Sequence, residues 1–98
     1  MKLENNFRFG AFVTLEKIKM LKGKKSSVLV GTQETGRLFQ TEHGGIIVFC
    51  KGGYAFCDTW IQTSKVKKIL ESTDEYVVFE TQTSVYKVSY HHAPRKAA

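Results

Sequence analysis

The 98-residue sequence predicts an all-β fold, a small antiparallel meander or barrel of six to seven short strands. Apolar and polar residues mostly alternate along the chain, which is the periodicity of a strand with one buried face. Glycine-rich or polar turn sequences recur at spacings of roughly 8–12 residues, which is typical of meanders, sandwiches and small barrels. The chain also lacks a convincing long helix that would cover a parallel sheet.

The first expected strand begins near residue 7, where five apolar residues alternate with less apolar positions: Phe7, Phe9, Ala11, Val13 and Leu15. A helix over 12–21 is the alternative, because apolar residues also recur there at three-residue steps. Either element would end at the polar turn sequence Lys22-Gly23-Lys24-Lys25.

Two further short strands are expected before the middle of the chain. Residues 26–31 contain the apolar run Val28-Leu29-Val30, and residues 37–41 form the next candidate strand. Gln33-Glu34-Thr35-Gly36 has the composition of a turn between them, and 42–45 that of the turn that follows.

The clearest local signal is a hairpin around Gly52-Gly53, because two glycines supply the positive φ angles of a tight type I′ turn. A two-residue turn there would pair Phe49 with Phe56 and Val48 with Cys57. Cys50 would then face Ala55, and Cys50 and Cys57 would point to opposite faces of the ribbon. That geometry disfavours a disulfide between the two cysteines.

The last third of the chain predicts one ambiguous element and one hairpin. Residues 65–72 fit a strand, with a short helix over 64–71 as the alternative. Tyr76–Glu80 and Val85–Tyr90 are rich in β-branched and aromatic residues and are joined by a polar turn. Four residues are expected in the core, namely Phe49, Phe56, Phe79 and Val88. Residues 1–92 are expected to form a single β domain, with 93–98 as a tail.

Motifs for enzymatic chemistry and metal binding are missing from the sequence. Cys50 and Cys57 lie within apolar strands, where a thiol usually serves as a small hydrophobic side chain. His43 is isolated, and neighbouring His91 and His92 would point to opposite sides of a strand. The glycine pairs do not belong to a phosphate-binding loop. We therefore expect no enzyme activity, no metal and no cofactor.

The sequence also lacks an apolar run long enough to span a membrane, and Met1–Asn6 is not followed by the apolar region of a signal peptide. Two cysteines without such a signal suggest free thiols in a reducing compartment. These features predict a cytoplasmic protein that does not bind membranes.

Positive charge is concentrated near the N-terminus. Seven of the 15 basic residues lie within residues 1–25, against two of the nine acidic ones, in a chain of formal net charge +6. Such asymmetry is typical of a surface that binds a polyanion. We therefore expect a nucleic-acid-binding module in which lysines contact phosphates and a tyrosine stacks on a base. The candidate residues are Lys17, Lys19, Lys22, Lys24, Lys25, Lys65, Lys67, Lys68 and Tyr54.

Two other functions fit the same composition. One is a protein-interaction module or inhibitor, of the kind that accompanies mobile elements, acting through sheet edges or as a homodimer. The other is a binder of an anionic small molecule at a barrel mouth or dimer groove. A solvated lysine-rich loop that aids solubility would explain the charge equally well.

Overall fold

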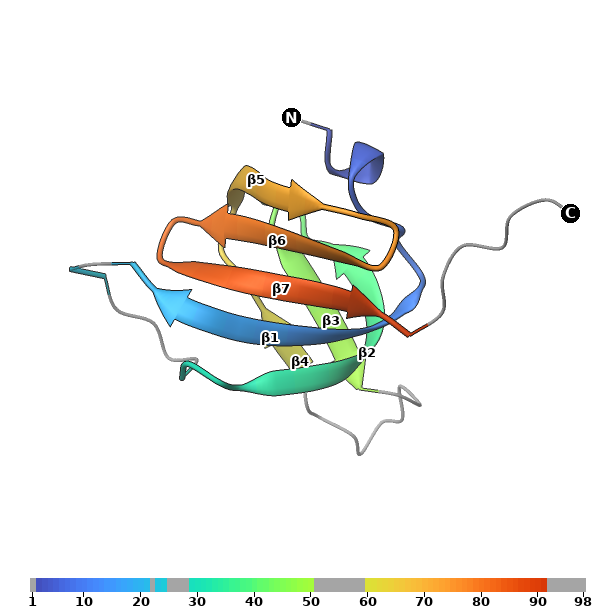
Figure 1. The fold of residues 1–98 in the computed structure, drawn as a ribbon, viewed down its shortest axis with the longest axis horizontal. Helices are drawn as coiled ribbons and strands as arrows, with labels where there is room; N and C mark the ends of the chain where they lie inside the picture. Colours follow the sequence, from blue (N-terminus) through green and yellow to red (C-terminus); the bar gives the residue numbers. More distant parts are fainter. Residues whose placement is uncertain (1, 22, 25–28, 51–59, 92–98) are drawn as a thin grey trace, which may run out of the picture.

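The computed structural model describes residues 2–21, 23–24, 29–50 and 60–91. Its seven strands form one antiparallel sheet in the order β4-β3-β2-β1-β7-β6-β5, preceded by the short 3-10 helix η1, Leu3–Asn5 (Figure 1). The strands are β1 (Phe12–Met20), β2 (Gln33–Gln40), β3 (Ile46–Cys50), β4 (Trp60–Gln62), β5 (Val66–Ser72), β6 (Tyr76–Thr81) and β7 (Ser84–Tyr90).

The predicted all-β meander is confirmed, and both helical alternatives are wrong. The segment at 12–21 is β1, the central strand, and the segment at 64–71 contains β5, an edge strand. In β1 the residues Val13, Leu15 and Lys17 are buried and alternate with more exposed neighbours. Every second side chain is buried, which indicates a strand, because a helix would bury side chains three and four residues apart.

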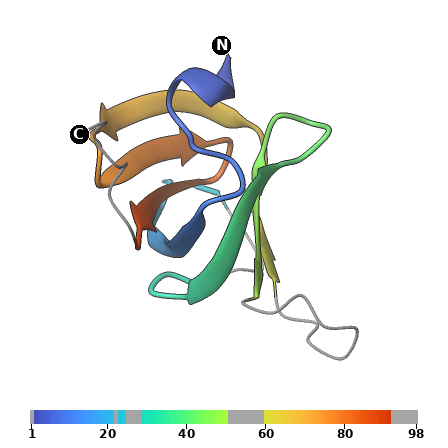
Figure 2. The same ribbon diagram turned by 90° about the vertical axis from the view of Figure 1, so that its right-hand side faces the viewer.

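The sheet curls so that its two halves face each other. Strands β5, β6, β7 and β1 form one curved layer, and β2 turns away from β1 to form the second layer with β3 and β4 (Figure 2). The core lies between them, with residues such as Leu38 and Val48 from one half and Val77 and Val88 from the other, all fully buried. The described strands of the two edges, β4 and β5, do not pair with each other.

A chain of aromatic rings extends through this core. The Phe7 ring meets Phe79 edge-on at a centroid distance of 5.3 Å, and Phe79 stacks on Tyr86 at 5.7 Å. Phe7 comes from the segment after η1, which lies across the opening between the two layers (Figure 2). Leu3 and Phe7 are only 5% and 3% exposed, so this segment closes one side of the core.

The expected first strand begins five residues too early. Phe7 and Phe9 precede β1, and their rings stack on each other at 5.9 Å instead of alternating across a sheet. Gly10, with φ of +90°, ends this segment in a left-handed conformation that breaks an extended strand. The N-terminal apolar residues are therefore core residues of a covering segment.

The connection between β1 and β2 differs from the expectation. Residues 29–31 are the described part of the predicted strand at 26–31, and they do not form a strand. Leu29 and Val30 there are 75% and 56% exposed. The predicted turn at 33–36 is instead the first half of β2. Polar residues suit it because they face polar partners on the outer face: Thr35 pairs with Thr14, with 3.0 Å between their hydroxyl oxygens, and Gln33 pairs with Glu16.

The register between β3 and β4 also corrects the sequence-based pairing. Phe49 pairs with Trp60 and Val48 with Ile61, so neither Phe56 nor Cys57 is their partner. The observed register places Ile61, 5% exposed, against the buried Val48. An aliphatic side chain on the inward face gains more from burial than a thiol does. The predicted Gly52-Gly53 turn and the positions of Phe56 and Cys57 lie outside the described residues.

The expected turn at 42–45, the last hairpin and two of the four expected core residues are confirmed, whereas the side chain of Phe49 lies outside the described part of the structure. Residues 42–45 form the turn between β2 and β3, and the last two strands form a hairpin through the turn at Gln82-Thr83. Phe79 and Val88 are fully buried, as expected for core residues. Residues 93–98, the expected tail, lie outside the described residues.

Candidate nucleic-acid interface

Five exposed lysines belong to segments that meet at one end of the sheet. At this end β1 ends, β6 turns into β7 and β5 begins (Figure 1). We call this surface the lysine end and define it by Lys19, Lys24, Lys65, Lys67 and Lys68. The residues come from segments far apart in the sequence, so only the strand pairing brings them together.

The register shows how two of them are related. Lys19 pairs with Val85 of β7, Val85 pairs with Glu80 of β6, and Glu80 pairs with Lys68 of β5. Lys19 and Lys68 therefore occupy the same outward-facing row, three interstrand spacings or about 14 Å apart along the sheet. The buried Val85 and the acidic Glu80 lie between them, so the row is neither continuously exposed nor uniformly basic.

The other lysines of this end lie at its margins. Lys65 and Lys67 flank Val66, which pairs with Thr81 beside the β6–β7 turn. Lys24 follows Leu21, whose N–H donates to Thr83 O of that same turn at 2.8 Å. Lys22, Lys25 and Tyr54 lie outside the described residues.

Lys17 is placed differently from the other candidates. It continues the inward-facing series of Val13 and Leu15, pairs with Tyr86 and has no exposed surface. Burial lowers the pKa of its ammonium group, because a low-dielectric surrounding disfavours the charged form. A β-bulge between Lys17 and Lys19 then returns the following lysine to the outer face. Lys17 therefore does not belong to the lysine end.

Replacing Lys17 by methionine should reveal this burial in the pH dependence of unfolding. Because the folded-state pKa is lowered, the unfolded chain binds more protons than the folded chain at pH values between that lowered pKa and 10.5. The stability of the original protein should therefore rise in this range relative to Lys17→Met. Urea unfolding across the alkaline range measures the difference. The exposed Lys19→Met is the control, and an equal pH dependence in both variants would contradict the prediction.

The position of β5 also gives its lysines a structural role. β5 is an edge strand with two register shifts, between Val66 and Lys68 and between Ile69 and Glu71. Charged side chains and bulges on an edge prevent pairing with other strands. The charges of Lys67 and Lys68 and the two register shifts are features of this kind.

Aromatic rings near the outer face are largely covered by cations of the same chain. The guanidinium of Arg37 lies 4.2 Å from the centroid of the Phe12 ring, and the Lys87 ammonium lies 4.6 Å from that of Tyr76. Such cation–π pairs stabilise the fold and occupy the ring face that a base would stack on. Phe39 is 40% exposed.

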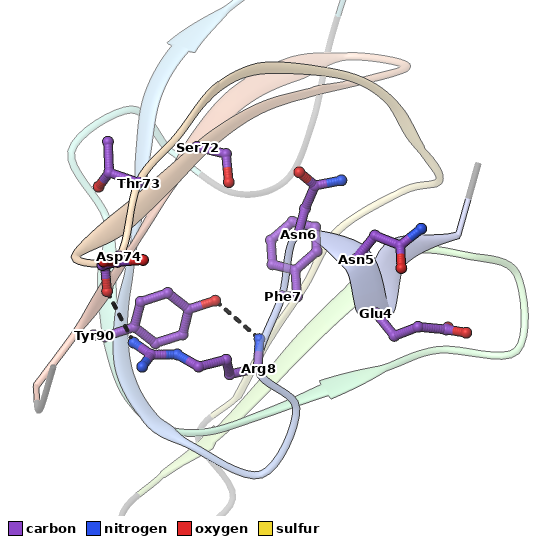
Figure 3. A pocket seen from close by; sticks show the side chains of 9 residues that line it. All are labelled: Glu4, Asn5, Asn6, Phe7, Arg8, Ser72, Thr73, Asp74 and Tyr90. Carbon is purple, nitrogen blue, oxygen red and sulfur yellow. Dashed lines mark hydrogen bonds between the residues drawn. The ribbon is translucent and has the colours of Figure 1, made fainter. Parts of the chain in front are cut away.

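A polar hollow of about 250 Å³ lies at the opposite end of β5, between the N-terminal segment and the β5–β6 turn (Figure 3). Arg8 fills its edge: its backbone N–H donates to the Tyr90 hydroxyl at 3.0 Å and its guanidinium donates to Asp74 O at 3.0 Å. The guanidinium also lies 3.8 Å from the Tyr90 ring centroid. Arg8 thus fastens the covering segment to the sheet, a role that the sequence did not indicate.

The two sheet edges approach each other at a junction built from backbone hydrogen bonds. Only Thr63–Lys65 separate β4 from β5, and they pack against the β2–β3 turn. Val66 N–H donates to Gly44 O at 3.0 Å, and Thr63 N–H donates to Ile46 O at 2.8 Å. The Thr63 hydroxyl accepts from Ile46 N–H at 2.9 Å. This network holds the junction in one geometry.

An open cleft of about 470 Å³ lies over this junction. Its lining residues are of polar types, although their aliphatic atoms make up much of the accessible surface, and none is a carboxylate: Thr41, His43, Gln62, Thr63, Ser64, Lys65 and Gln82. A second hollow of about 380 Å³ adjoins it, shares Thr41, His43 and Gln62, and adds Phe39 and Ile47 together with Glu42. Only Lys65 of this lining is among the candidates predicted from the sequence, because the other residues come from turns and strands that are far apart in the chain.

The described parts of the chain contain no cluster of three or more His, Cys, Asp or Glu side chains that could hold a metal ion. They also contain no helix of the length and apolar character required to cross a membrane. Comparison with protein families, with curated proteins and with solved structures finds no match to this chain.

Proposed function

We propose that this chain is a non-catalytic binding domain that contacts nucleic acid through its lysine end. The observation that carries the proposal is the gathering of Lys19, Lys24, Lys65, Lys67 and Lys68 at one end of the sheet. Lysines on a common surface attract the phosphate backbone and release its counterions. The formal net charge of +6 favours the same encounter from a distance.

The arrangement favours backbone contact over reading of base sequence. Lysine is a flexible point charge, whereas base edges are usually read by planar, bidentate groups. The surface also contains Glu80 between Lys19 and Lys68, which limits how closely a strand follows that row. We therefore expect weak sequence preference and strong salt dependence.

The test is the affinity for a fluorescent single-stranded oligonucleotide across a salt series. The triple variant Lys19→Gln/Lys67→Gln/Lys68→Gln should bind at least tenfold more weakly at low salt. Each phosphate contact contributes about 0.7 to the slope of log affinity against log salt, so the slope should fall by about 2.

Lys2→Gln is the control, because Lys2 is exposed at the start of η1. Residues of η1 lie beside Ser72 and Asp74, at the end of β5 opposite to the lysine end. This variant should leave both the affinity and the slope close to those of the original protein. Size-exclusion mass measured on the same samples separates nucleic-acid binding from self-association. Absence of binding to DNA and RNA even at low salt would refute the proposal.

A further inference from the structure

The cleft over the junction and the adjoining hollow together have the chemistry of a nucleotide site. We infer that they hold one nucleotide unit, with the phosphate beside Lys65 and the base against Phe39. The inference deepens the proposed function, on which it partly rests, since the same unit occurs as a free nucleotide or as one residue of an unpaired strand.

The cleft beside Lys65 suits the phosphate. Lys65 is its one lysine and is exposed, and His43 and Thr41 supply further polar groups on the side of the β2–β3 turn. The lining contains no carboxylate, so an anion meets no like charge within this cleft. Ser64 Oγ is buried without a hydrogen-bond partner among the described residues, and buried hydroxyls normally have one. A polar ligand therefore finds both charge and hydrogen-bonding capacity here.

The adjoining hollow suits the base. Phe39 is 40% exposed and borders the hollow together with Ile47, its partner across β2 and β3. Aromatic side chains are the usual stacking partners of unpaired bases. The amide of Gln62 borders both spaces, and an amide donates to and accepts from the edge of a base. Glu42 adds an acceptor for amino groups.

The site is also rigid and continuous with the lysine end. The hydrogen bonds of Val66 to Gly44 in the β2–β3 turn and of Thr63 to Ile46 at the start of β3 fix its floor, which reduces the cost of ordering a ligand. Lys65 belongs both to the cleft and to the lysine end, and Gln82 of the β6–β7 turn closes the cleft on that side. A strand that follows the lysines would therefore pass the cleft and place one base in it.

The test uses the full chain with two probes, a nucleoside monophosphate followed by amide chemical shifts and a single-stranded oligonucleotide followed by fluorescence anisotropy. The monophosphate should shift amides of the β2–β3 turn and of Thr63–Lys65. Loss of the stacking ring in Phe39→Ala should weaken both ligands about tenfold. Phe39→Tyr, which keeps the ring, should retain binding. Lys65→Gln should weaken the monophosphate more than it weakens the corresponding nucleoside.

Lys68→Gln separates the two proposals, because it changes the lysine end outside the cleft. It should weaken the oligonucleotide and leave the monophosphate unchanged. Oligonucleotide binding that is indifferent to Phe39→Ala, together with no binding of the monophosphate, would overturn the nucleotide site and leave the proposed function standing. Monophosphate binding without oligonucleotide binding would overturn the proposed function and leave the nucleotide site standing. No binding of either probe would overturn both.

Discussion

Replacing Phe79 by alanine is expected to lower the free energy of unfolding by about 3–5 kcal/mol, the usual cost of removing a buried aromatic side chain. Phe79 is fully buried and contacts the rings of both Phe7 and Tyr86. The substitution therefore loosens the covering segment from the sheet in addition to leaving a cavity. Domains of this size have a total stability of about 5–15 kcal/mol, so the variant should be close to unfolding.

Urea unfolding followed by tyrosine and tryptophan fluorescence measures this loss. Phe39→Ala is the matched control, since the same side chain is removed from a site that is 40% exposed. We expect it to cost about 1 kcal/mol or less, because it leaves no closed cavity. Equal losses in the two variants would show that the aromatic chain through the core does not hold the N-terminal segment.

Replacing Gly45 by alanine should be the second most damaging change, with a loss of about 3 kcal/mol for an overpacked site. A Cβ atom there would lie 2.4 Å from Thr63 O and 2.9 Å from Ser64 O, both of which are backbone atoms. Neither atom yields without moving the link between β4 and β5. The strain should therefore appear as a local opening of the junction.

Hydrogen exchange locates this effect. The amides of Thr63 and Val66, which donate to Ile46 O and Gly44 O, should exchange faster in Gly45→Ala. Gly23→Ala serves as the control because no described atom lies within 4 Å of its Cβ position, while its φ of +76° is a source of strain. That change should cost about 1 kcal/mol, without faster exchange at the junction. A Gly45→Ala variant as stable as Gly23→Ala would disprove the tight packing.

The sequence predicted those features of the fold that depend on local alternation. Val77, Phe79 and Val88 alternate with more exposed residues, and the turn at 82–83 separates two unambiguous strands, so the hairpin followed directly. For the strands at 12–20 and 66–72 the sequence does not distinguish a strand from a helix, because apolar residues in both also recur at helical steps. Both form strands because β1 pairs with β7 and β5 pairs with β6. The pairing of β1 with β7 joins residues that are distant in the sequence.

The errors have the same origin. Phe7 and Phe9 alternate as a strand would, yet their burial comes from covering the core between the two layers. The glycine pair Gly52-Gly53 predicts that Phe49 pairs with Phe56. In the structure, burial of Ile61 against Val48 sets the register of β3 and β4. Local turn propensity is weak beside the burial of a whole face.

By itself, the sequence determined the all-β class, the excess of positive charge and the basic residues available for a surface. Only the tertiary structure decided which lysines belong together, because strand order places Lys19 beside β7 and β6 and brings Lys68 into its row, while it buries Lys17. The cleft around Lys65 depends equally on the curl of the sheet, which brings the β2–β3 and β6–β7 turns to one site. Charge is a property of composition, but a binding surface is a property of register and curvature.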